Sequence, residues 1–103
     1  MAPSQVTPEM RLLAAHELQQ LRDAQATFDE QERQFGTRIT QLTAALRDPN
    51  LDKGSRDDLE AALAEVDQAE QDYRGLAVNR IQVIKQQISD TQQDIQDLLA
   101  AQP

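Results

Sequence analysis

The middle of the chain contains oxygen-bearing side chains at the spacing of a calcium-binding loop. The first, third and fifth positions of such a loop would be Asp48, Asn50 and Asp52. The match then ends, because Lys53 occupies the sharp-turn position and Leu59 stands where a bidentate acid is required. A helix end, an Asp-Pro turn and a new helix N-cap explain the same residues. We therefore predict no metal site in this segment.

Histidine and cysteine chemistry is almost absent from the chain. There is no cysteine, and His16 is the single histidine. A di-metal site in a helical bundle needs Glu-x-x-His pairs on two helices, and the residue three positions before His16 is Leu13. No glycine-rich phosphate loop or nucleophile elbow is present. These observations predict no catalytic residue, no metal and no cofactor, and they indicate that the protein is not an enzyme.

Acidic side chains dominate the charge of the chain. The 103 residues include 18 acidic and 10 basic ones, which gives a formal net charge of −8. Such a charge disfavours direct binding to nucleic acid or to an anionic membrane. One basic-free stretch has acids that could form a docking surface for a basic partner: Asp57, Asp58, Glu60, Glu65 and Asp67. The alternative is that these carboxylates form a solvated helix face.

The elements that position these residues are two long helices. Glycine and proline are sparse, and residues that favour helix fill the stretches between them. We predict a helix over 8–47 with Thr7 as its N-cap, a loop over 48–55 that contains Pro49, and a helix over 56–100 that begins with a capping box at Ser55. Residues 1–7 and 101–103 are expected to be flexible ends.

Heptad spacing predicts that the two helices pair as an antiparallel coiled-coil hairpin. The seam, meaning the positions that face the partner helix, is predicted in the first helix at Ala14, Leu18, Leu21, Gln25, Phe28, Glu32, Phe35, Ile39, Leu42 and Leu46. In the second helix it is predicted at Leu59, Leu63, Val66, Glu70, Tyr73, Ala77, Ile81, Ile84, Ile88, Thr91, Ile95 and Leu98. The consecutive four-residue steps at Tyr73–Ala77–Ile81 form a stutter, which unwinds a coiled coil locally. The register places Phe28 against Gly75, where the missing side chain would leave room for the ring.

Two predicted seam positions are polar, Gln25 and Glu32. Buried polar residues at such positions cost stability but specify register and oligomeric state. The alternative is a slight rotation of the helix that lets both side chains reach solvent. We favour that alternative for Glu32, because an unpaired buried carboxylate is expensive. Arg74 and Arg80 are candidate partners for it.

Apolar residues beside the seam widen the apolar face toward the open end of the hairpin. A wide apolar face on a two-helix unit is typical of a contact with another chain. We predict a homo-oligomer, most simply an antiparallel four-helix-bundle dimer. The predicted interface consists of Leu12, Leu13, Leu76, Val83, Ile84 and Ile88. The alternative is that these residues only thicken the seam within one chain.

The all-α architecture predicts a non-enzymatic protein–protein interaction module that acts in assembly as an adaptor, scaffold or chaperone. Its partners would be further copies of itself and another protein. A second hypothesis is an acidic inhibitor or DNA mimic that blocks a basic nucleic-acid-binding protein. A third is an oligomeric small-molecule sponge, although the sequence favours no small-molecule ligand. No apolar window approaches a bilayer span and the N-terminus lacks the pattern of a signal peptide, so we expect a cytoplasmic location.

Overall fold

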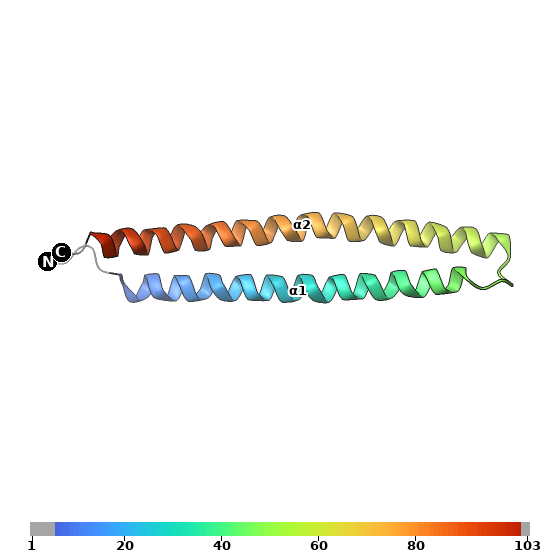
Figure 1. The fold of residues 1–103 in the computed structure, drawn as a ribbon, viewed down its shortest axis with the longest axis horizontal. Coiled ribbons are helices and arrows are strands. Elements are labelled where there is room, and N and C mark those ends of the chain that lie inside the picture. The colour runs from blue at the N-terminus through green and yellow to red at the C-terminus, as the bar shows by residue number, and fades with distance from the viewer. Residues whose placement is uncertain (1–5, 102–103) are drawn as a thin grey trace. The chain divides into compact units, whose positions relative to one another are not determined.

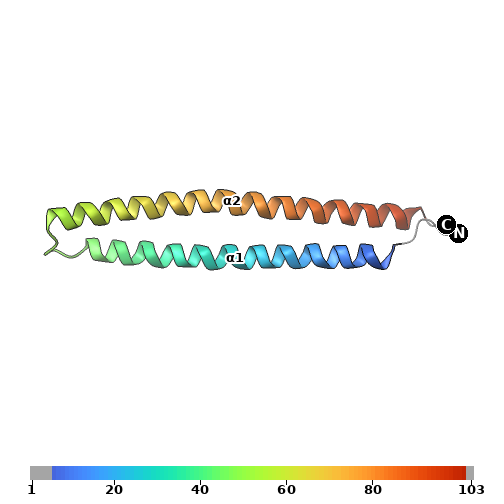
Figure 2. The same cartoon turned by 180° about the vertical axis from the view of Figure 1, so that it is seen from behind.

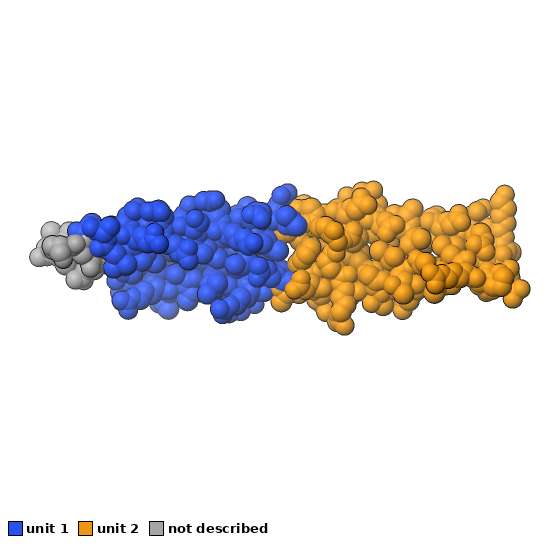
Figure 3. All heavy atoms as spheres, viewed as in Figure 1, with its two compact units in different colours: residues 1–25, 78–103 blue, residues 26–77 orange. Residues whose placement is uncertain are grey.

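The protein is an all-α helical hairpin. The computed structural model describes residues 6–101, which form two α-helices, α1 (Pro8–Leu46) and α2 (Lys53–Ala100), and no strand. The chain divides into two compact units, drawn in different colours in Figure 3. The terminal unit comprises residues 1–25 and 78–103, and the distal unit comprises residues 26–77. Within each unit α1 and α2 lie side by side and run antiparallel (Figures 1 and 2), so the predicted fold class is confirmed.

Helix α1 begins and ends where proline chemistry predicts. Thr7 is its N-cap: the Thr7 Oγ1 accepts a hydrogen bond from the Met10 N–H at 3.2 Å. Pro8 occupies the first helical position, where a missing N–H costs nothing. The helix ends at Leu46, one residue before the predicted end. Pro49 excludes the helical conformation from the residue before it, so the chain must turn here.

Helix α2 begins at Lys53, three residues before the predicted start, and its N-cap is Asp52. The predicted capping box at Ser55 is wrong, because the Ser55 N–H itself donates to Asp52 Oδ1 at 2.7 Å. Hydrogen bonds from Ser55 hold the pKa of Asp52 below its ordinary value. The guanidinium of Arg56 donates to the Leu46 carbonyl at 3.0 Å. Arg56 therefore ties the first turn of α2 to the carbonyl end of α1.

The seam of α2 follows the predicted heptads over its whole length. All twelve predicted positions, from Leu59 to Leu98, are buried or half-buried, including those of the stutter at Tyr73–Ala77–Ile81. The flanking residues of the stutter, Gly75 and Val78, are exposed. The four-residue insertion in the heptad pattern is therefore part of the packed seam.

The seam of α1 differs from the prediction in the terminal unit. Glu17 and Ala24 occupy seam positions, whereas Leu18 and Gln25 are exposed. From Phe28 onward every predicted position is half-buried. The steps Ala24–Phe28–Glu32 thus form a second stutter. A stutter changes how fast the seam rotates around the axis of its helix. Two packed helices stay in contact only if both seams rotate in the same way, so the stutter in α2 requires a matching one in α1.

The hairpin buries few side chains completely. Among residues 6–101 only Ile84, at 6% exposed, and Glu17, at 5%, are buried, and no large side chain is fully enclosed. A helix with one neighbour shields one narrow stripe, so the remaining seam side chains stay half-buried. The packing of one chain therefore leaves most of its surface accessible to solvent.

Candidate functional site

The three aromatic residues of the chain form one cluster in the distal unit. Tyr73 of α2 stacks on Phe28 with the ring centroids 6.2 Å apart, and it packs against Phe35 at 5.9 Å. The predicted contact of Phe28 with Gly75 is wrong, since a Cβ on Gly75 would meet nothing within 4 Å. The ring lies against a neighbouring aromatic side chain because stacking supplies contact that an open glycine does not.

A charged triad lies beside this aromatic cluster. The guanidinium of Arg74 pairs with Glu32 across the hairpin at 2.6 Å and with Glu70 on its own helix at 2.7 Å. Of the two candidate partners that the sequence offers for Glu32, Arg74 is the one that pairs with it. The expectation that Glu32 reaches solvent is wrong, because its side chain is only 22% exposed and its Oε1 is buried without a hydrogen-bond partner. Pairing with Arg74 lets the carboxylate stay in the seam.

The two carboxylates of the triad have opposite pKa shifts. Hydrogen bonding from Arg74 lowers the pKa of Glu32. Partial burial and the neighbouring Glu32 carboxylate raise the pKa of Glu70, although Arg74 opposes that shift. One guanidinium therefore faces two carboxylates, and Glu70 is the carboxylate that binds a proton more readily than usual.

Replacing Glu70 with glutamine is expected to raise the Tm at neutral pH. A raised pKa means that the contribution of Glu70 to stability is fully present below its unfolded-state pKa and is lost as the pH rises through the folded-state value. The glutamine amide removes the negative charge beside Glu32 at every pH and adds N–H donors to the triad. Thermal unfolding followed by circular dichroism at about pH 4.5 and about pH 8 measures the gain, which should be larger at the higher pH.

The control for this variant is Asp67→Asn, which removes one negative charge from the same helix at an exposed position outside the triad. It distinguishes a Tm gain caused by changing Glu70 within the triad from a Tm gain caused by lowering the total acidic charge. A Tm gain at pH 8 that is equal in both variants would show that the triad has no part in it.

The second polar site of the seam is in the terminal unit. Glu17 of α1 is 5% exposed, and its Oε1 accepts a hydrogen bond from the Thr91 hydroxyl of α2 at 2.5 Å. Sequence reasoning missed this pair, because the neighbouring Leu18 fits a single uninterrupted heptad pattern. The spacing Ala14–Glu17–Leu21 is as regular as the predicted Ala14–Leu18–Leu21, so the only sequence signal for Glu17 is the stutter in α2, which requires a matching stutter in α1.

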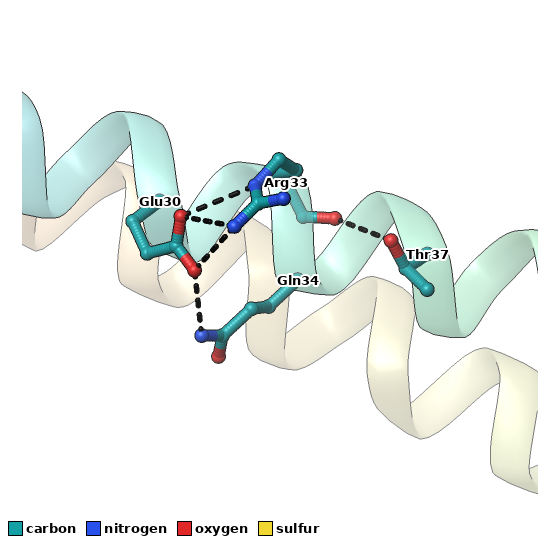
Figure 4. A network of polar contacts seen from close by, with 4 residues as sticks. All are labelled: Glu30, Arg33, Gln34 and Thr37. Carbon is teal, nitrogen blue, oxygen red and sulfur yellow. Dashed lines mark hydrogen bonds and ion pairs between the residues drawn. The ribbon is translucent and has the colours of Figure 1, made fainter.

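The outer face of α1 in the distal unit carries a network confined to one helix (Figure 4). Arg33 pairs with Glu30 at 2.6 Å, and the Gln34 amide donates to the same carboxylate at 3.1 Å. The Thr37 hydroxyl donates to the Arg33 carbonyl at 3.0 Å. All four side chains are exposed, so these contacts support the helix surface and contribute little to stability.

The predicted interface residues fall into two groups. Four of them are exposed to solvent: Leu12 at 70%, Leu13 at 51%, Leu76 at 73% and Val83 at 58%. Ile84 is buried in the terminal unit and Ile88 is half-buried, so both pack within the hairpin. Leu76 belongs to the distal unit, whereas the other exposed residues belong to the terminal unit.

The five acids of the predicted docking surface are all exposed, but they do not share one side of α2. Asp58 and Glu65 are seven residues apart and lie on one side. Glu60 and Asp67 have the same spacing and lie about 160° further around the helix. Asp57 lies between these two pairs, on the side of α2 opposite the seam. A single flat partner could therefore contact one of the two pairs at a time.

Within the described part of the chain, no group of three or more metal-ligating side chains lies close enough to hold an ion. Neither α1 nor α2 contains a stretch that is both long and apolar enough to cross a bilayer. The comparisons with family models, curated proteins and solved structures found no match to this chain. The geometry of the hairpin is therefore the basis for inferring function.

Proposed function

We propose that the protein is a helical protein–protein interaction module whose contact surface is the terminal unit. The observation that carries this proposal is the distribution of exposed large apolar side chains. Among residues 6–101, six of the seven lie in the terminal unit and one lies in the distal unit. The six are Leu12, Leu13, Leu18, Val78, Val83 and Leu99. These side chains lie on more than one side of the terminal unit, and exposed apolar side chains gathered in one unit favour contacts with other chains there.

The accessible surface of the chain supports the same proposal. It amounts to 7680 Å², whereas a compact monomer of this mass exposes about 5,800 Å². Because few side chains are buried within one hairpin, association with another chain would supply the apolar burial that a small domain lacks.

The two units also differ in charge. Residues 26–77 contain 12 acidic and 6 basic residues, a net charge of −6, and the remaining residues contain 6 acidic and 4 basic ones, a net charge of −2. Strong like charge opposes close packing of identical surfaces. Because acidic and basic residues nearly balance in the terminal unit, charge repulsion between two copies is weak there. Apolar contact is therefore favoured in the terminal unit rather than in the distal unit.

The test is quantitative capture from the producing cells with the tagged wild-type chain and matched variants, read by mass spectrometry. The terminal variant is Leu12→Gln with Val83→Gln, and the control is Leu76→Gln, an equally exposed leucine in the distal unit. Proteins that bind through the terminal unit should be lost with the first variant, by about tenfold, and retained with the control. Equal recovery with both would contradict the proposal.

A second candidate function rests on the acidity of the distal unit. None of the five predicted docking acids takes part in an ion pair with another described residue, so all remain available to a basic protein. This alternative predicts salt-sensitive capture of a basic partner. The pair Asp58→Asn with Glu65→Gln and the pair Glu60→Gln with Asp67→Asn, used in the same experiment, would show which side is contacted. Unchanged recovery with both pairs would exclude it.

A further inference from the structure

The terminal unit has two exposed faces of opposite charge. Successive helical residues are rotated by about 100°. In an antiparallel pair, the residues that immediately follow a seam position therefore point to one side of the hairpin from both helices. The residues that immediately precede a seam position point to the other side. The observed seam of the terminal unit thus assigns almost every exposed side chain beside it to one of two faces.

The first of these, the basic face, follows the seam positions. Its charged residues are Arg11, Arg22 and Lys85, which follow Met10, Leu21 and Ile84, and it contains no acid. Its exposed large apolar residues are Leu18, Val78 and Leu99. The face therefore combines three positive charges with half of the exposed large apolar side chains of the terminal unit.

The second, the acidic face, precedes the seam positions. Its acidic residues are Glu9, Asp23, Asp90, Asp94 and Asp97. Arg80 and His16 are the basic residues among them, which leaves a formal net charge of −4 with His16 neutral, and Leu13 and Val83 are its exposed large apolar residues. The two faces thus match each other in charge, and each carries apolar contact area.

We propose that the protein assembles with itself by docking the basic face of one terminal unit on the acidic face of the next. A second copy is the partner that fits, because it presents the complementary charge and apolar side chains on the same structural unit. Contact between two identical faces is disfavoured, since it would oppose three positive charges or a net four negative ones. This inference deepens the proposed function by naming one partner and the surface that it uses.

A contact between two different faces has consequences for symmetry. When copies dock in this way, the copy at one end of the assembly keeps an unoccupied basic face and the copy at the other end keeps an unoccupied acidic face. Such a heterologous contact continues into a ring or an open chain and does not stop at a closed dimer. The four-helix-bundle dimer predicted from the sequence would instead require a self-complementary face.

The test uses two full-length variants that each abolish one face. Variant A reverses the basic face with Arg11→Glu, Arg22→Glu and Lys85→Glu. Variant B reverses the acidic face with Asp90→Lys, Asp94→Lys and Asp97→Lys. The matched control places three reversals in the distal unit, Asp58→Lys, Glu65→Lys and Asp67→Lys. Mass is measured by light scattering and sedimentation velocity, and circular dichroism checks that each variant stays helical.

Wild type and the control are expected to exceed the protomer mass of 11.6 kDa, with a mass that rises with concentration and falls with salt. Each variant alone should associate at least about tenfold more weakly. An equimolar mixture of A and B should recover assembly, because every acidic surface of A then meets a basic surface of B. That recovery also shows that both variants are folded.

Three results would overturn this inference. The first is a wild-type chain that stays at the protomer mass. The second is loss of assembly in only one variant, which a contact between two identical faces would give. The third is a mixture of A and B that does not associate. None of these results contradicts the proposed function that the capture experiment tests, because another protein could still bind the apolar residues of the terminal unit. Conversely, restored assembly in the mixture would stand even if no other protein were captured.

Discussion

Replacing Glu17 with leucine together with Thr91 with valine is expected to raise the free energy of unfolding by about 2 kcal/mol. Glu17 is 5% exposed at a seam position, and the Thr91 hydroxyl is its hydrogen-bond donor across the hairpin. A buried carboxylate loses its hydration, and one neutral donor recovers only part of that cost. Apolar side chains of similar size would remove the cost and extend the seam around Ile84. Denaturant unfolding at fixed protein concentration, followed by circular dichroism, measures the gain.

The single variant Thr91→Val distinguishes a polar cost from a simple gain in apolar area. It leaves the Glu17 carboxylate buried without its donor, so it should lower stability by about 1–3 kcal/mol, opposite in sign to the double variant. If the double variant is less stable than wild type, the polar pair is a net stabilising feature of the seam and the expected sign is wrong.

The polar pair also illustrates what heptad spacing predicts and what it does not. In α2 the apolar residues recur so regularly that all twelve seam positions, including the stutter, follow from the sequence. In α1 Leu18 and Gln25 continue one uninterrupted pattern, while the structure uses Glu17 and Ala24. The correct phase depends on the requirement that α1 match the stutter of its partner. That requirement arises from pairing, so the spacing within α1 alone does not contain it.

The helix ends and the charged triad show the same distinction. Pro8 and Pro49 restrict the backbone directly, so the ends of α1 are predicted within one residue. At the start of α2 both Asp52 and Ser55 are competent N-caps, and the choice depends on how far the loop extends. Arg74 is a correct candidate partner for Glu32 because charge demands a partner, but the position of Glu70 beside them requires coordinates.

The charged faces of the terminal unit depend on the seam phase more than any other feature. With Leu18 in the seam, as the sequence predicts, the residues beside the seam change and the basic face loses its central leucine. A shift of one residue rotates a helix by about 100°. The oligomer prediction from the sequence therefore rests on which residues are apolar, whereas the proposed self-assembly also depends on the face on which each residue lies.

Replacing Tyr73 with alanine is expected to lower the free energy of unfolding by about 3 kcal/mol. The Tyr73 ring contacts both Phe28 and Phe35, at centroid distances of 6.2 and 5.9 Å. Truncation would leave both rings without an aromatic neighbour, because the chain has no other aromatic residue. Denaturant unfolding of Tyr73→Ala beside Tyr73→Phe measures the effect. Phenylalanine keeps the ring and should remain within about 0.5 kcal/mol of wild type, whereas an equal loss in both variants would assign the stability to the hydroxyl and not to stacking.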